Sequence, residues 1–129
     1  MAIVQQFTVT LANRPGALAE VCSELAKVAV NIHALEGGVT AGSAAIRLVV
    51  GRVEAARKVL VALGLRFTEE QVLAVKVADR PGSLGKVLRK LAEKGINIEY
   101  SYGSIARGET QALIVLGVSN LDAAAAVAR

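Results

Sequence analysis

A short motif with an arginine, a proline and a glycine occurs twice in the 129-residue chain, at residues 13–16 (Asn-Arg-Pro-Gly) and 79–82 (Asp-Arg-Pro-Gly). Each copy lies between an alternating apolar segment and a segment with helical periodicity, where a helix should begin. The first amide groups of a helix lack partners and carry partial positive charge, which suits a carboxylate. Asn13 offers a donor and an acceptor, whereas Asp79 offers only acceptors.

A second polar residue follows each motif at the same distance, because Asn31 and Asn97 each lie eighteen residues after the first residue of the motif. Together these groups could hold a small zwitterion with one ammonium and one carboxylate. Since the second strand starts away from the loop, they would meet across a packed pair of units. The alternative is structural: residues 13 and 79 cap helices, and residues 31 and 97 form turns.

These residues belong to an internal repeat with an offset of 66 residues. Residues 11–18 return as 77–84, and the correspondence continues without a gap. It includes two glycine pairs further along the chain, Gly42 with Gly108 and Gly51 with Gly117. The repeat predicts two tandem units, residues 1–70 and 71–129, in place of one domain.

The two copies show the same order of predicted elements. Period-two apolar patterns predict strands, apolar residues three and four apart predict helices, and a glycine-rich turn between two β-rich segments predicts a hairpin. The first copy has predicted strands at 5–11, 30–36, 44–50 and 65–69, a turn at 37–42, and helices at 15–28 and 52–63. The second has predicted strands at 72–78, 96–102 and 110–116, a turn at 103–108, a helix that Gly95 ends, and a last helix that Asn120 or Asp122 caps.

The order β-α-β-β-α-β is that of the ferredoxin-like fold, an α+β arrangement with helices on one face of an antiparallel sheet. Right-handed crossovers place the first strand beside the third. The second copy lacks its last strand, because Arg129 aligns with Leu63. We expect another chain or residues 65–71 to cover the edge of strand 72–78, unless that edge stays short and exposed.

Composition narrows the class of protein. Hydrophobic residues make up 53%, which excludes a disordered chain, and a single Cys excludes a disulfide framework. Mean hydropathy is high at +0.49, yet the apolar runs are too short for a membrane helix and the start lacks a secretory signal. We therefore expect a cytoplasmic protein. The net charge of +4 comes from basic residues that we expect to be dispersed over a solvated surface.

Rival functions lack the residues they need. RNA recognition on this topology uses aromatic side chains on the first and third strands, and the third strands have none. Tyr100 and Tyr102 share a face with Ile98 and predict an interface or pocket wall. Cys22 falls on an apolar helix stripe and His33 on a strand, so no nucleophile–base pair is visible, and the acylphosphatase pattern is absent. We expect no enzyme, no metal, no cofactor and no nucleic acid partner.

The pattern Asn-Arg-Pro-Gly-x-Leu followed by Val-Asn-Ile resembles the ACT domain family, and the second copy carries it with Asp79 in place of the first Asn and Ile96 in place of Val. The tandem layout is similar to that of stand-alone double-ACT proteins. The resemblance implies that an amino acid effector binds where two ACT units meet, and that units pair side by side into a homodimer or higher homo-oligomer. The positions that match the family's ligand-binding pattern are Asn13, Arg14, Pro15, Gly16, Leu18, Asn31 and Ile32 in the first copy, and Asp79, Arg80, Pro81, Gly82, Leu84, Asn97 and Ile98 in the second.

Two departures from the family pattern affect the expected ligand. Leu11 and Val77 stand where some serine-binding members carry His, which argues against serine. Asp79 replaces the loop Asn, and a carboxylate prefers an ammonium group and repels a carboxylate, so the two sites should differ. We expect an amino-acid-sensing regulatory protein whose output passes through a partner such as a metabolic enzyme. The alternative is a ligand-free regulatory subunit or structural dimer that acts only by pairing.

Overall fold

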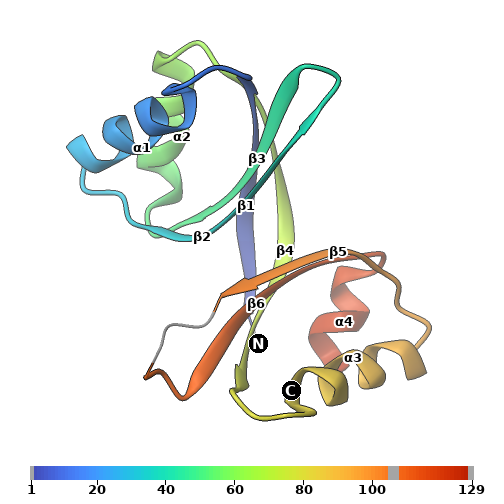
Figure 1. Ribbon diagram of the computed structural model, residues 1–129. Coiled ribbons are helices and arrows are strands. Elements are labelled where there is room, and N and C mark those ends of the chain that lie inside the picture. Colours follow the sequence, from blue (N-terminus) through green and yellow to red (C-terminus); the bar gives the residue numbers. More distant parts are fainter. Residues whose placement is uncertain (1, 105–107, 128–129) are drawn as a thin grey trace. The chain divides into compact units, whose positions relative to one another are not determined.

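The computed structural model describes residues 2–104 and 108–127, which form an α+β fold with four helices and six strands (Figure 1). The strands are β1 (Ala2–Ala12), β2 (Ile32–Thr40), β3 (Ser43–Val50), β4 (Arg66–Ala78), β5 (Ile98–Ser104) and β6 (Gln111–Val118). The helices are α1 (Ala17–Lys27), α2 (Val53–Ala62), α3 (Ser83–Glu93) and α4 (Leu121–Val127). The strands are hydrogen-bonded in the order β2-β3-β1-β4-β6-β5.

The chain divides into two compact units, here called the first unit (Gln5–Glu70) and the second unit (Gln71–Arg129 together with Met1–Val4). The strand order is β2-β3-β1-β4 in the first unit and β5-β6-β4-β1 in the second. Antiparallel pairing joins β1 to β3 and β4 to β6. The prediction that the first strand of each copy lies beside the third is therefore confirmed.

The expectation that β4 lacks a partner inside the chain, or takes one from residues 65–71, is wrong. Residues 65–69 and 72–78 are parts of a single strand, β4, because no glycine or proline interrupts the segment. The neighbour of β4 is β1, whose first residues belong to the second unit. The second unit is therefore not short of a strand: its fourth strand comes from the beginning of the chain.

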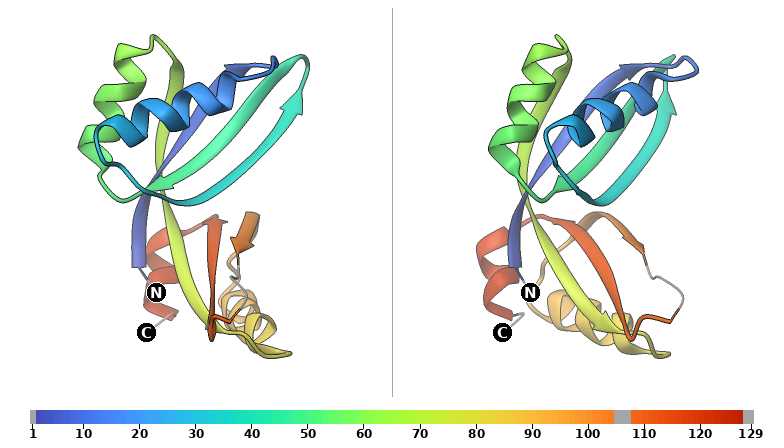
Figure 2. Two further views of the ribbon diagram at one scale, coloured as in Figure 1. Left: turned by 60° about the vertical axis from the view of Figure 1, so that its left-hand side comes forward. Right: turned by 90° about the vertical axis from the view of Figure 1, so that its left-hand side faces the viewer.

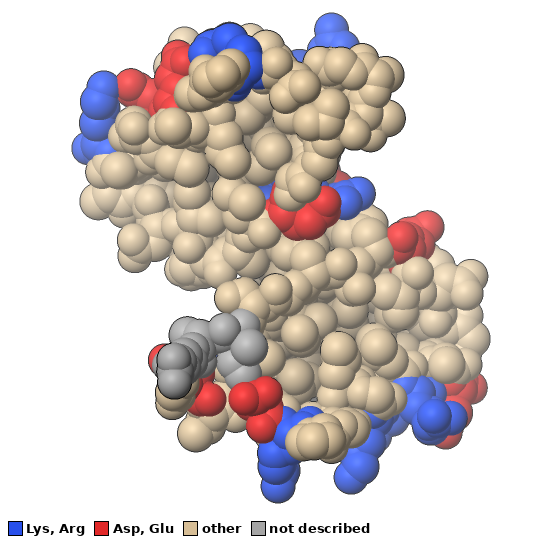
Figure 3. All heavy atoms as spheres, in the orientation of Figure 1, with Lys and Arg blue, Asp and Glu red and all other residues tan. Residues whose placement is uncertain are grey.

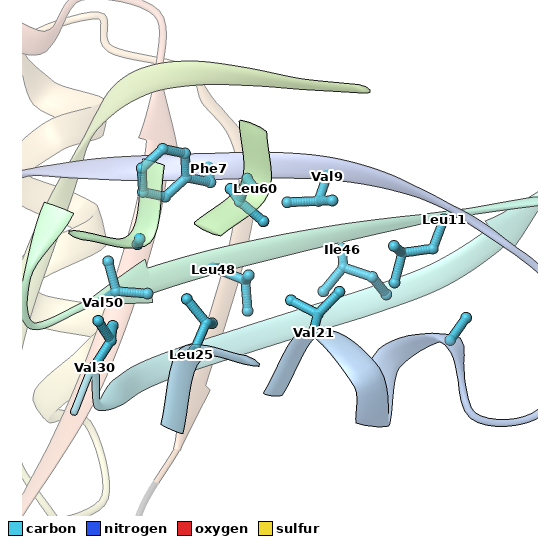
Figure 4. Close-up of a cluster of buried hydrophobic side chains, with 12 residues drawn as sticks. Phe7, Val9, Leu11, Val21, Leu25, Val30, Ile46, Leu48, Val50 and Leu60 are labelled. Atoms are coloured by element: carbon cyan, nitrogen blue, oxygen red, sulfur yellow. The ribbon is translucent and has the colours of Figure 1, made fainter. Parts of the chain in front are cut away.

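The core of the first unit lies between its helices and one face of its strands (Figure 2). Phe7, Val9 and Leu11 alternate along β1, and their side chains are at most 5% exposed. From α1, Val21 and Leu25 point toward these strands (Figure 4). Because β1 turns every second side chain to this face and α1 every third or fourth, both periodicities seen in the sequence meet in one apolar layer.

The second unit repeats this core with smaller side chains. Leu73, Val75 and Val77 of β4 take the places of the three β1 residues, and Leu91 of α3 is fully buried among them. From α4, Ala124 is also fully buried. The end of α3 at Gly95, which has a φ of 71°, confirms the predicted C-terminal stop, and the amide of Ala123 donates to the Asn120 Oδ1, which confirms the Asn120 cap.

The glycine-rich turns predicted at 37–42 and 103–108 are wrong in extent. β2 continues to Thr40, and only Ala41 and Gly42, both with positive φ, form the hairpin turn. Gly37 lies inside β2, where an added Cβ would stand 2.5 Å from the Ile46 Cδ1. In the second copy β5 runs to Ser104, and residues 105–107 of the predicted turn lie outside the described residues. Gly37 and Gly103 therefore do not form turns, but leave space for the side chains of Ile46 and Ile114 on the neighbouring strand.

The prediction that the repeat continues without a gap is also wrong beyond this hairpin. Phe7 pairs with Leu48 in the first unit, and its counterpart Leu73 pairs with Leu116, so the offset rises from 66 residues on β1 to 68 on β3. The amide of Gly51 donates to the Asn31 carbonyl, and in the second unit Ser119 donates to the Asn97 carbonyl. Gly51 therefore corresponds to Ser119 and not to Gly117, because the second copy has two more residues between its hairpin strands.

Candidate functional site

An open groove of about 360 Å³ lies beside the Arg-Pro-Gly loop of the first unit. All of its lining residues belong to that unit, and they come from the end of β1, the loop, the start of α1 and the β2–β3 hairpin. They are Leu11, Ala12, Asn13, Arg14, Ala17, Leu18, Leu35, Gly37, Gly38, Val39, Ala44 and Ile46. Three predicted ligand-binding residues, Asn13, Arg14 and Leu18, are therefore brought together at one hollow of the surface.

The loop has the same backbone geometry in both copies. The amide of Arg14 donates to the Ala12 carbonyl at 2.9 Å, and Arg80 donates to Ala78 at the same distance. Gly16 and Gly82 then precede the helices with φ of 87° and 88°, a region that favours glycine. The structural alternative, in which residues 13 and 79 cap the helices, is wrong, because the glycines occupy the cap position and no side chain caps either helix.

Arg14 is held across the start of α1. Its guanidinium contacts the Glu20 carboxylate at 3.1 Å and donates to the Pro15 carbonyl at 3.4 Å. Both partners of the ion pair are more than half exposed, so the pair adds little stability. The ion pair orients the Arg14 guanidinium toward Glu20 of α1, while Arg14 still lines the edge of the groove.

Asn31 and Ile32 are not part of this groove. Asn31 precedes β2 at the opposite end of the hairpin, where its carbonyl accepts the amide of Gly51 at 2.9 Å. Seven residue steps along β3 separate the partner of Ala12 from the partner of Ile32, which is roughly 23 Å at the usual rise of a strand. Within one unit, the loop and the start of β2 therefore do not reach one small ligand together.

The corresponding residues of the second unit are divided in the same way. Asp79 and Arg80 line a hollow of about 510 Å³ together with polar residues near β6, namely Glu109, Thr110 and Gln111. Arg80 also lines a smaller hollow with Pro81, Gly82, Ser83 and Lys86. Asn97 lies at the far end of β5, where its amide donates to the Ser119 Oγ at 3.0 Å, and Ile98 begins β5 beside it.

The sequence interpretation missed the hairpin side of the groove, which includes Leu35, Gly37, Val39 and Ile46. Leu35 and Val39 are large apolar residues of β2 that remain 42% and 58% exposed. Their signal in the sequence is the alternation of apolar residues that continues through the glycines into residue 39, which the predicted turn at 37–42 obscured.

The residues considered for catalysis show no catalytic arrangement. Cys22 is a free, half-buried thiol on α1. His33 is exposed and lies at a bulge of β2, and its imidazole ring packs against Gly51. Among residues 2–104 and 108–127, no three His, Cys, Asp or Glu side chains are grouped so that they could hold a metal ion. In the same ranges, every helix is too short or too polar to cross a membrane.

Basic residues gather on α3, contrary to the expectation that they are dispersed (Figure 3). Lys86, Arg89 and Lys90 lie three and four residues apart and so share the exposed face of the helix, and Lys94 follows directly. In the described part of the chain these four cations form no ion pair. The second unit therefore presents a cationic helix face.

The family model described as the ACT domain matches residues 6–63 and again residues 71–129. The chain therefore belongs to the ACT domain family, as the motif resemblance predicted, with two domains in tandem. No curated protein matches the chain in sequence.

Solved structures give the particular relatives. Protein BT0572 from Bacteroides thetaiotaomicron is 30% identical with a TM-score of 0.89, over 97% of this chain and 85% of that one. The ligand-free regulatory subunit of aspartate kinase from Thermus thermophilus is 17% identical with a TM-score of 0.67, over 98% and 95% of the two chains. The corresponding subunit from Thermus flavus is 19% identical with a TM-score of 0.63, over 98% and 87%. These two subunits share the fold.

Proposed function

We propose that this chain is a non-catalytic regulatory protein that binds an amino acid effector where ACT units meet, and that it acts on a metabolic enzyme as a separate partner. The observation that carries the proposal is the groove of the first unit, which adjoins the loop with Asn13, Arg14 and Gly16. A concave site with mainly apolar walls and a few polar groups is the usual form of a small-molecule site.

The loop supplies the polar groups that an amino acid needs. No side chain caps α1, and although the amide of Ala17 donates to the Arg14 carbonyl, the positive end of the helix still favours a carboxylate, with the Arg14 cation at the groove edge. The Asn13 amide can donate to a carboxylate or accept from an ammonium group. Asn31 and Ile32 would join the same effector only from another unit, as in a homodimer or higher homo-oligomer.

The second unit supports a different or weaker site. Asp79 replaces the neutral amide by a carboxylate, which repels the carboxylate of an amino acid. Arg80, Pro81, Gly82, Leu84, Asn97 and Ile98 remain the proposed contacts of this second site. Two neighbours of the same fold are regulatory subunits of aspartate kinase, which makes an enzyme of amino acid metabolism our first candidate partner.

Thermal stability of the full chain with each of the twenty amino acids at millimolar concentration tests the proposal. A ligand at a hundred-fold excess over its Kd stabilises the folded state by about 2.7 kcal/mol. We expect one amino acid or one chemical class to raise Tm. No rise with any of the twenty would overturn the proposal in favour of the alternative, a subunit or structural dimer that acts only by pairing.

Two variants that exchange the first residue of the two loops locate the site, when each is titrated calorimetrically with the effector. Asn13→Asp gives the first loop the residue of the second, and Asp79→Asn does the reverse. If the first unit binds the effector, Asn13→Asp weakens binding by tenfold or more, and Asp79→Asn leaves it intact or adds a second site. Unchanged affinity in Asn13→Asp, Asn13→Ala and Asn31→Ala would place the site elsewhere.

A further inference from the structure

We propose that the effector of the first unit is an amino acid with a bulky apolar side chain, of the leucine, isoleucine, valine, methionine or phenylalanine class. The inference rests on the proposed function and specifies its ligand. It follows from the chemistry of the groove walls, from the exposure of two of them, and from a comparison with the second unit.

The walls of the groove offer an apolar environment. Asn13 and Arg14 are its only lining residues with polar side chains, and both come from the loop at one end. At the other end, Leu35, Val39 and Ile46 of the hairpin and Leu18 of α1 present aliphatic groups. None of the described lining residues is a carboxylate that could neutralise a lysine or arginine side chain, and the lining cation, Arg14, lies at the loop end, where the proposed function places the effector's own carboxylate. Burial of a charged side chain there would lack a partner.

Two groove residues are exposed although they are large and apolar. Leu35 is 42% exposed and Val39 is 58% exposed, and both stand on β2 beside Gly37 and Gly38. Gly37 lies between them on the same face of β2, and the Ile46 side chain fills the space above it, so Leu35, Ile46 and Val39 form one apolar floor. An apolar ligand side chain lying over this floor would remove the exposed faces of Leu35 and Val39 from water, the usual source of affinity in such a site.

Among the described residues, the second unit has a polar residue at one position of this wall. By the pairing of the strands, Leu35 opposite Leu48 corresponds to Ser101 opposite Leu116. Ser101 is exposed and polar, and the hollow beside Asp79 is lined by Glu109, Thr110 and Gln111. We therefore assign the apolar ligand class to the first unit and expect one apolar effector per chain.

Calorimetric titration of the full chain with leucine, isoleucine, valine, methionine and phenylalanine, compared with alanine, serine, lysine and aspartate, tests the ligand class. One missing methylene in an apolar pocket reduces affinity by about tenfold or more. We expect at least one of the five apolar amino acids to bind ten or more times tighter than alanine and serine, with no measurable binding of lysine or aspartate.

The chain offers a matched pair of variants for the groove itself. Val39→Ser removes an apolar wall, whereas Val61→Ser removes a valine of similar exposure, 63%, from α2 outside the groove. We expect Val39→Ser to weaken binding by about tenfold and Val61→Ser to leave it unchanged. Both side chains are mostly exposed, so both variants should fold, which the unliganded Tm verifies.

The outcomes separate this inference from the proposed function. If lysine, aspartate, serine or another polar amino acid binds more tightly than all five apolar ones, the ligand class is wrong while the sensing function stands. If an apolar amino acid binds equally well to the Val39→Ser and Val61→Ser variants, the groove is not its site. If no amino acid binds, the proposed function fails together with the inference.

Discussion

The central core residues of the two ACT units correspond, whereas their cross-strand pairs and helix surfaces do not. Leu25 and Leu91 occupy the same place and are both at most 1% exposed. On the hairpin, however, Ala34 faces Val49 in the first unit, and Tyr100 faces Gly117 in the second. The smaller residue of the pair is on β2 in the first unit but on β6 in the second, where the Tyr100 ring lies directly over Gly117. The scaffold is common to both units and the surfaces are individual.

The outer faces of the equivalent helices carry opposite charges. Glu20 and Glu24 of α1 correspond to Lys86 and Lys90 of α3 at the repeat offset of 66. In the first unit each glutamate is within 3.1 Å of a cation, Arg14 or Lys27. Because the same fold tolerates both charge patterns, these residues do not determine the fold. The difference shows that the two units present different surfaces to ligands and partners.

The largest expected effect comes from the exchanged hairpin pair. Gly117→Val places a side chain where the Tyr100 ring lies, and such overpacking costs about 1–3 kcal/mol of unfolding free energy. The double variant Tyr100→Ala with Gly117→Val recreates the pair of the first unit. We expect urea denaturation to show a favourable coupling of at least about 1 kcal/mol between the two changes. Additive effects would mean that the two units do not use equivalent pairs.

A reciprocal exchange at the helix ends should give effects of opposite sign. Ala29 and Gly95 both follow a helix in the left-handed region, with φ of 57° and 71°, and the next amide bonds to the Leu25 or Leu91 carbonyl. Ala29→Gly relieves backbone strain and should raise stability by about 0.5–1 kcal/mol, and Gly95→Ala should lower it by a similar amount. Urea denaturation measures both, and two changes of the same sign would contradict the equivalence of the helix ends.

The smallest expected effect is a pH dependence of stability that an ion pair of the first unit supplies. Hydrogen bonds from the Arg57 guanidinium, with a further one from Gln5, lower the pKa of Glu69 below its ordinary value of 4.5. Because the folded pKa is the lower one, this stabilisation is present above pH 4.5 and is lost as pH falls through the folded pKa.

Thermal unfolding between pH 6 and pH 3 measures this loss. Glu69→Gln should make the fall of Tm with acid shallower, and Arg57→Ala should do the same because it removes the main cause of the lowered pKa. The double variant should add nothing further. If Tm of Glu69→Gln falls with pH as steeply as that of the unchanged chain, Glu69 does not cause the loss of stability in acid.

Much of the local structure could be predicted from neighbouring residues. The alternation around Val9 and Val75 and the stripe through Val21 and Leu25 depend on contacts inside one element, so their periods are visible in the sequence. The expected cap at residue 13 is absent. A polar residue there is typical of a helix cap, but the positive φ of Gly16 decides where α1 begins. The groove was only half predicted: its loop carries a motif, but its hairpin wall does not.

The repeat, the order of helices and strands, the apolar faces and the paired Arg-Pro-Gly loops could be predicted from residue types at short separations. Folding of the whole chain was needed to show that β1 completes the second unit, that the hairpin offset is 68, and that Leu35 and Val39 face the loop of Asn13. Each of these depends on residues far apart in the chain, whose pairing is set by hydrogen bonds and side-chain packing that no local pattern records.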